Sequence, residues 1–165
     1  MKKNALFILS IFIIFSFMQC KNRNNSPQNL FSCEIDGTQW ETTQVTTNVI
    51  QSGSLFTVDI VATHANGQAI YLKIYSLSQS GQGNYPLGNA NFQNEATFAP
   101  QGNFSLNTQN WKSSPICNSP QGNYIQIDEL QNGFLNGSFT TTVCFSNGTI
   151  KRITNGKLFQ LTARM

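Results

Sequence analysis

Residues 55–76, which read LFTVDIVATHANGQAIYLKIYS, contain the pattern that decides the fold. Apolar side chains occur at every second position in each half of this stretch. They are Phe56, Val58, Ile60 and Ala62 in the first half, and Ile70, Leu72 and Ile74 in the second. A period of two is typical of a β-strand with one buried face. Because Asn-Gly lies between the halves, the stretch predicts a β-hairpin.

The length of the hairpin loop determines which faces of the two strands meet. A two-residue loop would pair even with odd positions and would place the two apolar faces on opposite sides of the sheet. A three-residue loop at 65–67, with Gly67 in the left-handed conformation, pairs Ile60 with Leu72 and keeps both apolar sets together. We therefore expect a type I turn followed by a G1 bulge.

The same alternation continues on both sides of the hairpin. Further strands are predicted at 31–35, 44–50, 96–99, 103–106, 124–128, 134–145, 150–154 and 157–163. Turns are predicted at the Xaa-Gly pairs 36–37, 52–53, 147–148 and 155–156, and loops at 77–91 and 107–122. No stretch has helical periodicity over three turns. The sequence therefore predicts an all-β domain, either an antiparallel β-sandwich or a partly open β-barrel of roughly 8–10 strands.

The last predicted strand also shows the alternation. In 157–163, Phe159, Leu161 and Ala163 are expected to face one way, and Gln160 and Thr162 the other.

The first twenty residues form a different kind of segment. Lys2 and Lys3 precede an apolar run at 5–17, and Cys20 follows at once. The run is too short for a transmembrane helix, which needs roughly 20 apolar residues. It is typical of the h-region of a secretory signal, which is removed. A cysteine at the cleavage point suggests that Cys20 takes a lipid such as palmitate and becomes the new N-terminus.

This segment predicts the domain organisation and the location. We expect a lipoprotein signal peptide at 1–19, the lipidated Cys20 with a flexible tether at 20–29, and one β domain at 30–165. The tether composition, KNRNNSPQN, cannot bury apolar surface, so we expect it to make no stable contacts with the domain. The expected location is the bacterial cell envelope, on the outer membrane, with the periplasmic or surface face left open.

The charge and composition of the chain limit the classes of partner that it is expected to bind. From Lys21 onward, eight Lys and Arg face seven Asp and Glu, since two of the ten basic residues are Lys2 and Lys3, and the difference is +1. A nearly neutral domain lacks the basic footprint of a nucleic-acid binder. Charged residues make up 10% of the chain, against about 25% in an average protein. Uncharged polar residues replace them, as on many exported β-proteins.

The four cysteines predict one disulfide. With Cys20 lipidated, Cys33, Cys117 and Cys144 remain. Antiparallel pairing of 124–128 with 134–145 brings position 117 opposite roughly 144–145. We expect the irregular, proline-containing segment 118–120 to place both cysteines on one face, which regular pairing does not quite do. Cys33 alternates with two apolar residues and is predicted to be a buried free thiol, with three unpaired thiols as the alternative.

Four stretches resemble a known group of proteins. They are FSCEIDGTQW at 31–40, GNYPLGN at 83–89, GNYIQIDELQNGFLNGSFTTTV at 122–143 and ITNGKLFQL at 153–161. Together they resemble small uncharacterised lipoproteins of the Bacteroidota, a family with a domain of unknown function. The resemblance implies an exported all-β domain and supplies no catalytic residues. One departure is Gln19, because the lipoprotein pattern normally has a small residue before the cysteine.

The polar residues indicate no catalytic or metal site. His64 is the only histidine and lies beside the predicted Asn66-Gly67 turn, so we interpret it as a loop residue, since a general base needs a partner. Asp36, Asp128 and Glu129 lack the spacing of a calcium loop, and Asp36 and Asp128 are interpreted as turn residues. The sequence therefore predicts no catalytic residue, no metal and no cofactor.

The aromatic residues offer one candidate binding site. Trp40, Trp111 and Tyr85, with neighbouring phenylalanines, are suited to an aromatic platform for a sugar or another ligand, although aromatic residues more often pack in the core. The sequence thus predicts a non-enzymatic structural or interaction module, with a small-molecule or glycan binder as the alternative and an enzyme as the third. Its expected partners are a membrane, through the lipid, and a protein or glycan. A pocket of about 300 Å³ or more with convergent polar groups would favour the binder.

Overall fold

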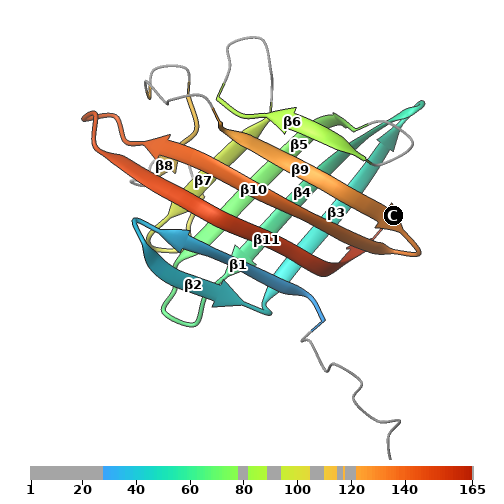
Figure 1. The fold of residues 1–165 in the computed structure, drawn as a ribbon, viewed down its shortest axis with the longest axis horizontal. Coiled ribbons are helices and arrows are strands. Elements are labelled where there is room, and N and C mark those ends of the chain that lie inside the picture. Colours follow the sequence, from blue (N-terminus) through green and yellow to red (C-terminus); the bar gives the residue numbers. More distant parts are fainter. Residues whose placement is uncertain are drawn as a thin grey trace, which may run out of the picture.

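The computed structural model describes residues 28–77, 82–88, 94–104, 110–114, 117 and 122–164 (Figure 1). The predicted signal peptide, Cys20 and most of the tether lie outside these residues. The strands are β1 (Leu30–Ile35), β2 (Thr38–Thr42), β3 (Val45–Ser52), β4 (Leu55–Thr63), β5 (Ala69–Leu77), β6 (Gly83–Pro86), β7 (Glu95–Ala99), β8 (Trp111–Lys112), β9 (Tyr124–Gln131), β10 (Phe134–Cys144) and β11 (Ile150–Arg164). Within this part of the chain, no helix is long and apolar enough to cross a membrane.

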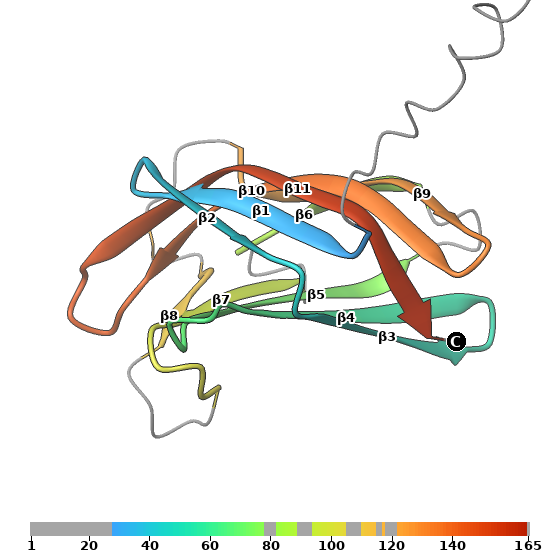
Figure 2. The ribbon, with the colours of Figure 1, turned by 90° about the horizontal axis from the view of Figure 1, so that it is seen from below.

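The strands form two stacked layers (Figure 2). One layer has the order β2-β1-β11-β10-β9-β6, and the other has the order β3-β4-β5-β7-β8. Alternate side chains of both layers point inward and make one core, which includes Phe31, Ile60, Leu72, Ile127 and Phe139. The predicted all-β class is confirmed.

Two short seams join the layers into one eleven-stranded sheet. At one seam, β11 runs parallel to β3 through two residue pairs, Ala163 with Thr47 and Arg164 with Asn48. At the other, β10 meets β8 through the single pair of Cys144 with Lys112. The sheet is therefore mixed rather than purely antiparallel.

The predicted hairpin is confirmed in its register. Ile60 pairs with Leu72, and both side chains are fully buried. Gly67 has a φ of +85°, and its nitrogen donates a hydrogen bond to the carbonyl oxygen of His64 at 2.9 Å. The three-residue loop therefore turns the chain with its glycine in the left-handed conformation, and the apolar faces of β4 and β5 coincide.

Several predicted boundaries are wrong. β6 lies within the predicted loop 77–91 and β8 within 107–122, because their pairing with β9 and with β7 decides their conformation. The described residues 103–104 are not in a strand.

The predicted turn at Asn155-Gly156 is a bulge inside the continuous strand β11. There Asn155 has a φ of +53°, and the pairing with both neighbouring strands shifts. Asn-Gly is suited to left-handed backbone in a bulge as well as in a turn, so the dipeptide alone does not distinguish them.

A second irregularity reverses the predicted face of Phe159. Gln160 has a φ of +47°, and its nitrogen donates to Asn136 Oδ1 at 2.7 Å. The irregularity breaks the alternation, so Leu158 and Leu161 are both buried while Phe159 is 36% exposed. The expectation that Phe159 shares a face with Leu161 and Ala163 is therefore wrong.

Asn29 belongs to the domain rather than to a contact-free tether. Its backbone nitrogen donates to Gln160 O at 3.1 Å. Its side-chain amide donates to Thr43 O and Val45 O and accepts a hydrogen bond from the nitrogen of Thr162. The ordered part of the domain therefore begins at least one residue before the predicted start at residue 30.

Candidate functional site

A cleft of about 490 Å³ lies at one end of the sandwich and is called here the end cleft. The β1–β2 turn, the β4–β5 turn, the end of β7 and the start of β11 surround it. It is lined by Ile35, Asp36, Thr38, Gln39, Trp40, His64, Asn66, Gln68, Phe98, Pro100 and Lys151. Polar side chains converge there because hairpin turns carry polar residues, while the strands beneath supply the apolar base.

Trp40 forms part of the apolar base of the end cleft. Its side chain is 5% exposed and meets the ring of Phe31 edge-on at 5.7 Å between centroids. Its Nε1 donates a hydrogen bond to Gln68 Oε1 at 3.1 Å. Because its ring contacts Phe31 and His64 and its N–H group has a hydrogen-bond partner, Trp40 is held in one orientation.

His64 covers Trp40 on the side of the β4–β5 turn. The two ring centroids are 5.4 Å apart, and the rings are tilted by 36°. His64 Nδ1 accepts a hydrogen bond from the backbone nitrogen of Asn66 at 3.2 Å. In the neutral imidazole the proton is therefore on Nε2. None of the described carboxylates bonds to this histidine, so the carboxylate partner that would mark a catalytic base is not present among them.

An ion pair occupies the rim of the end cleft. Lys151 Nζ lies 3.2 Å from Asp36 Oδ2, and Asp36 Oδ1 accepts a hydrogen bond from the nitrogen of Arg152 at 2.8 Å. The ammonium group also lies 5.4 Å from the centroid of the Trp111 ring, a cation–π distance. The two charges cancel, so this rim offers donors and acceptors without a net charge.

The three aromatic residues predicted as a platform do not share one surface. Trp40 lines the end cleft. Trp111 does not line it, and its ring packs against Phe98 and Phe145 and lies under the ammonium group of Lys151. Trp111 Nε1 is buried, and no described residue forms a hydrogen bond with it. Tyr85 lies on β6, at the opposite edge of its layer from β2.

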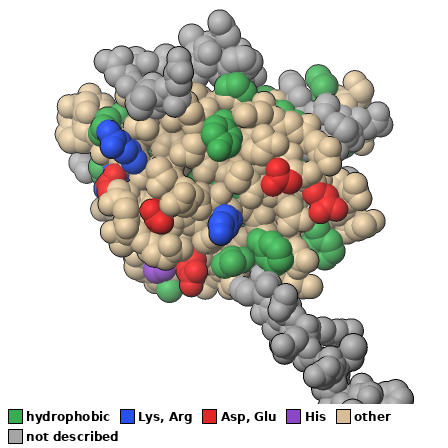
Figure 3. All heavy atoms as spheres, viewed as in Figure 1, with side chains coloured by type: hydrophobic (Ala, Val, Ile, Leu, Met, Phe, Trp, Pro, Cys, Tyr) green, Lys and Arg blue, Asp and Glu red, His purple; other side chains and the backbone are tan. Residues whose placement is uncertain are grey.

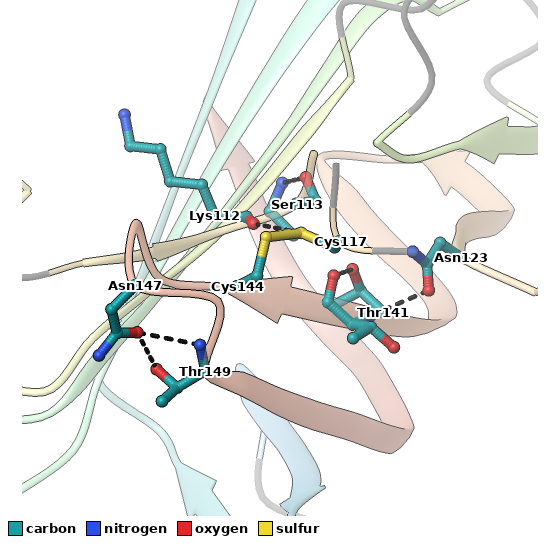
Figure 4. The surroundings of a disulfide bond; sticks show 10 residues. Lys112, Ser113, Cys117, Asn123, Thr141, Cys144, Asn147 and Thr149 are labelled. Atoms are coloured by element: carbon teal, nitrogen blue, oxygen red, sulfur yellow. Dashed lines mark hydrogen bonds between the residues drawn. A yellow bond between two sulfur atoms is a disulfide. The ribbon is translucent and has the colours of Figure 1, made fainter. Parts of the chain in front are cut away.

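The predicted disulfide is present between Cys117 and Cys144, whose Cα atoms are 5.5 Å apart (Figure 4). Its geometry differs from the predicted one, because Cys144 pairs with Lys112 of β8 and not with position 117. A turn closed by the Cys117 nitrogen and Ser114 O, at 3.0 Å, returns the chain so that Cys117 Sγ lies 3.3 Å from Lys112 O. The bridge therefore reinforces the seam between β8 and β10. Residues 118–120 lie outside the described residues.

Cys33 is a buried free thiol, as predicted. Burial, with a smaller contribution from Glu34, raises the pKa of this thiol to about 12. Its sulfur therefore stays protonated and unreactive at neutral pH.

Sequence reasoning missed Gln39, Gln68 and Lys151 as residues of the end cleft. The turns that present them were partly foreseeable from the Asp36-Gly37 and Asn66-Gly67 signals. Lys151 meets Gln39 because β1 pairs with β11, which joins segments more than 100 residues apart, and Gln68 comes from the other layer, where it accepts a hydrogen bond from Trp40. In the described part of the chain, no three His, Cys, Asp or Glu side chains form a set that would hold a metal ion.

Comparison with known proteins identifies one family. Residues 27–162 match the family described as a domain of unknown function, DUF6252. No curated protein and no solved structure matches the chain. The matched region begins close to Asn29, which the β domain holds through its side chain.

Proposed function

This chain belongs to the DUF6252 family, and we propose that it is a non-enzymatic binding module that a lipid on Cys20 holds in the bacterial cell envelope. The end cleft is the observation that supports binding over a purely structural role. Its volume of about 490 Å³ falls within the usual range of ligand pockets, roughly 300–1,000 Å³. It also combines buried aromatic rings with converging polar groups.

The chemistry of the end cleft favours a neutral, polar ligand, for which a glycan is the best match. Gln39, Asn66 and Thr38 offer amide and hydroxyl groups of both donor and acceptor type. The Asp36–Lys151 pair adds charge-assisted partners that cancel in sign. A strongly charged ligand would leave one of these two groups facing a like charge.

Binding is tested with the mature lipoprotein on an array of neutral, amino and acidic saccharides, followed by titration of the retained compounds. Gln39→Ala removes an exposed amide from the end cleft and is expected to weaken binding about tenfold, near 1.4 kcal/mol. Gln51→Ala is the matched control, because Gln51 is an exposed strand glutamine near the tip of the β3–β4 hairpin and does not line the end cleft. Equal affinity of the two variants, or retention of no saccharide, would contradict a glycan site.

The anchor is tested separately, by intact-mass analysis of protein extracted from membranes. A diacyl or triacyl mass on a chain that starts at Cys20 is expected. Because Gln19 is larger than the residue usual at that position, Gln19→Gly is expected to be processed at least as well as the natural sequence. A soluble mature protein cleaved elsewhere, or an intact Met1 terminus, would contradict the anchor. The proposed partners are then the membrane and a glycan, with no role in nucleic-acid binding.

A further inference from the structure

An apolar patch surrounds the point where the chain enters the β domain. Phe159 on β11 and Phe134 on the neighbouring β10 are each 36% exposed, and Leu30 pairs directly with Phe159. These three residues are called here the root patch. Figure 3 shows hydrophobic side chains gathered close to the place where the chain enters. A groove of about 700 Å³ begins at the root patch and is lined by Leu30, Phe159 and Lys157 among others.

The exposure of Phe159 results from a specific backbone feature. Left-handed Gln160 breaks the alternation of β11 and leaves the phenylalanine on the outer face. Two exposed phenylalanine rings on neighbouring strands gain nothing from contact with water, so their location points to another surface that covers them.

The covalent length of the chain identifies the surface that can cover the root patch. Asn29 is held to Gln160 and Thr162 by hydrogen bonds, so the entry point is fixed beside Phe159. Cys20 precedes Asn29 by nine residues, which span at most about 32 Å when fully extended. A lipid on Cys20 would therefore keep the root patch within about one domain diameter of the bilayer.

We propose that the root patch lies against the bilayer that holds the lipid anchor, so that the end cleft faces away from the membrane. This inference rests on the proposed anchor, but not on the glycan site. Phenylalanine rings are suited to the boundary between headgroups and acyl chains, and Lys157 can reach the headgroups while its stem stays on apolar surface. Asp128 and Glu129 line the same groove, so a zwitterionic surface suits it better than an anionic one.

The orientation is tested with the full mature lipoprotein in zwitterionic phospholipid vesicles whose acyl chains are brominated, since bromine quenches nearby tryptophan. Phe159→Trp places a reporter in the root patch. Ile150→Trp is the matched control, because Ile150 is 49% exposed at the opposite end of β11. After subtraction of the natural Trp40 and Trp111 signal, the added emission is expected to fall at least twofold in Phe159→Trp and to stay unchanged in Ile150→Trp.

Flotation of the vesicles separates failure of the anchor from failure of the orientation. Protein that does not float with the vesicles would overturn the anchor and the orientation together. Protein that floats but shows equal quenching of the two reporters, or none, would overturn the orientation alone. A blue-shifted Phe159→Trp emission that bromine does not quench would indicate a second protein copy on the patch and would also overturn it. Phe134→Trp serves as the root-patch reporter if Phe159→Trp does not reach the thermal stability of the natural protein.

Discussion

Asn29 Oδ1 accepts a hydrogen bond of 3.1 Å from the backbone nitrogen of Thr162, although 133 positions separate the two residues. The amide nitrogen of the same side chain donates to Val45 O at 3.0 Å and to Thr43 O at 3.1 Å. One side chain thus spans the seam where β11 leaves β1 and reaches β3. Since the strands themselves contribute only two residue pairs there, Asn29 supplies much of the polar pairing at this edge.

Removal of the Asn29 side chain is expected to destabilise the domain. Asn29→Gly keeps the left-handed backbone, whose φ is +63°, but leaves two carbonyls and one N–H group without their partner. We expect the free energy of unfolding to fall by about 1–3 kcal/mol in chemical denaturation.

Asn132→Gly is the matched control for this variant, because Asn132 has a φ of +53° in the exposed β9–β10 turn. It is expected to change stability by less than about 0.5 kcal/mol. Equal effects of the two glycine substitutions would show that the Asn29 side chain does not hold the seam.

The disulfide is expected to stabilise the second seam. Cys117 and Cys144 are 27 positions apart. Closing a loop of that size lowers the conformational entropy of the unfolded chain, which raises the free energy of unfolding by about 3.5 kcal/mol. The double variant Cys117→Ser, Cys144→Ser should lose about that much in urea denaturation. A reducing agent should lower the midpoint of the natural protein and leave that of the double variant unchanged. Non-reducing peptide mapping that finds a bridge to Cys33 would contradict the assignment.

Cys33 is expected to make stability fall in alkaline solution. Its thiol has a pKa of about 12 when folded and 9.0 as the unperturbed value. Between these values the unfolded chain has lost a proton that the folded chain keeps, so the free energy of unfolding falls as pH rises, by up to about 1.4 kcal/mol per pH unit. Below pH 9 both states are protonated and this slope vanishes.

Cys33→Ala removes this titration, so its stability should depend less steeply on pH between 9 and 12 than that of the natural protein. The comparison concerns the slope and not the absolute stability, because the substitution also leaves a small cavity. Parallel stability curves for the two proteins across this range would contradict the raised pKa.

Replacing Gly156 by any residue with a Cβ atom, even alanine, is expected to destabilise the domain. A Cβ atom there would overlap the ring of Phe139, which packs over the glycine and against Phe31. Gly156→Ala should therefore cost about 1–3 kcal/mol through overpacking. Phe139→Leu in the same chain should recover part of that loss, which a double-mutant cycle measures as a favourable coupling. Additive effects of the two changes would show that the ring does not limit this position.

The sequence by itself determined the features that depend on neighbouring residues. The period of two in 55–76 and the Asn66-Gly67 loop were enough to predict the register of β4 and β5, because side-chain alternation and turn conformation are local properties. The cysteine count predicted one disulfide, and the expected strand pairing together with the alternation around Cys33 predicted its partners, Cys117 and Cys144. Trp40, one of the three residues predicted as an aromatic platform, lines the end cleft.

Only the tertiary structure decided the features that depend on which distant strands meet. Asn155-Gly156 reads as a turn, yet pairing with β1 and β10 makes it a bulge, and left-handed Gln160 moves Phe159 to the outer face. Lys151 reaches Asp36 across 115 positions because β1 lies beside β11. Long-range pairing is selected by the burial that it gives the whole sheet, and no local pattern specifies that choice.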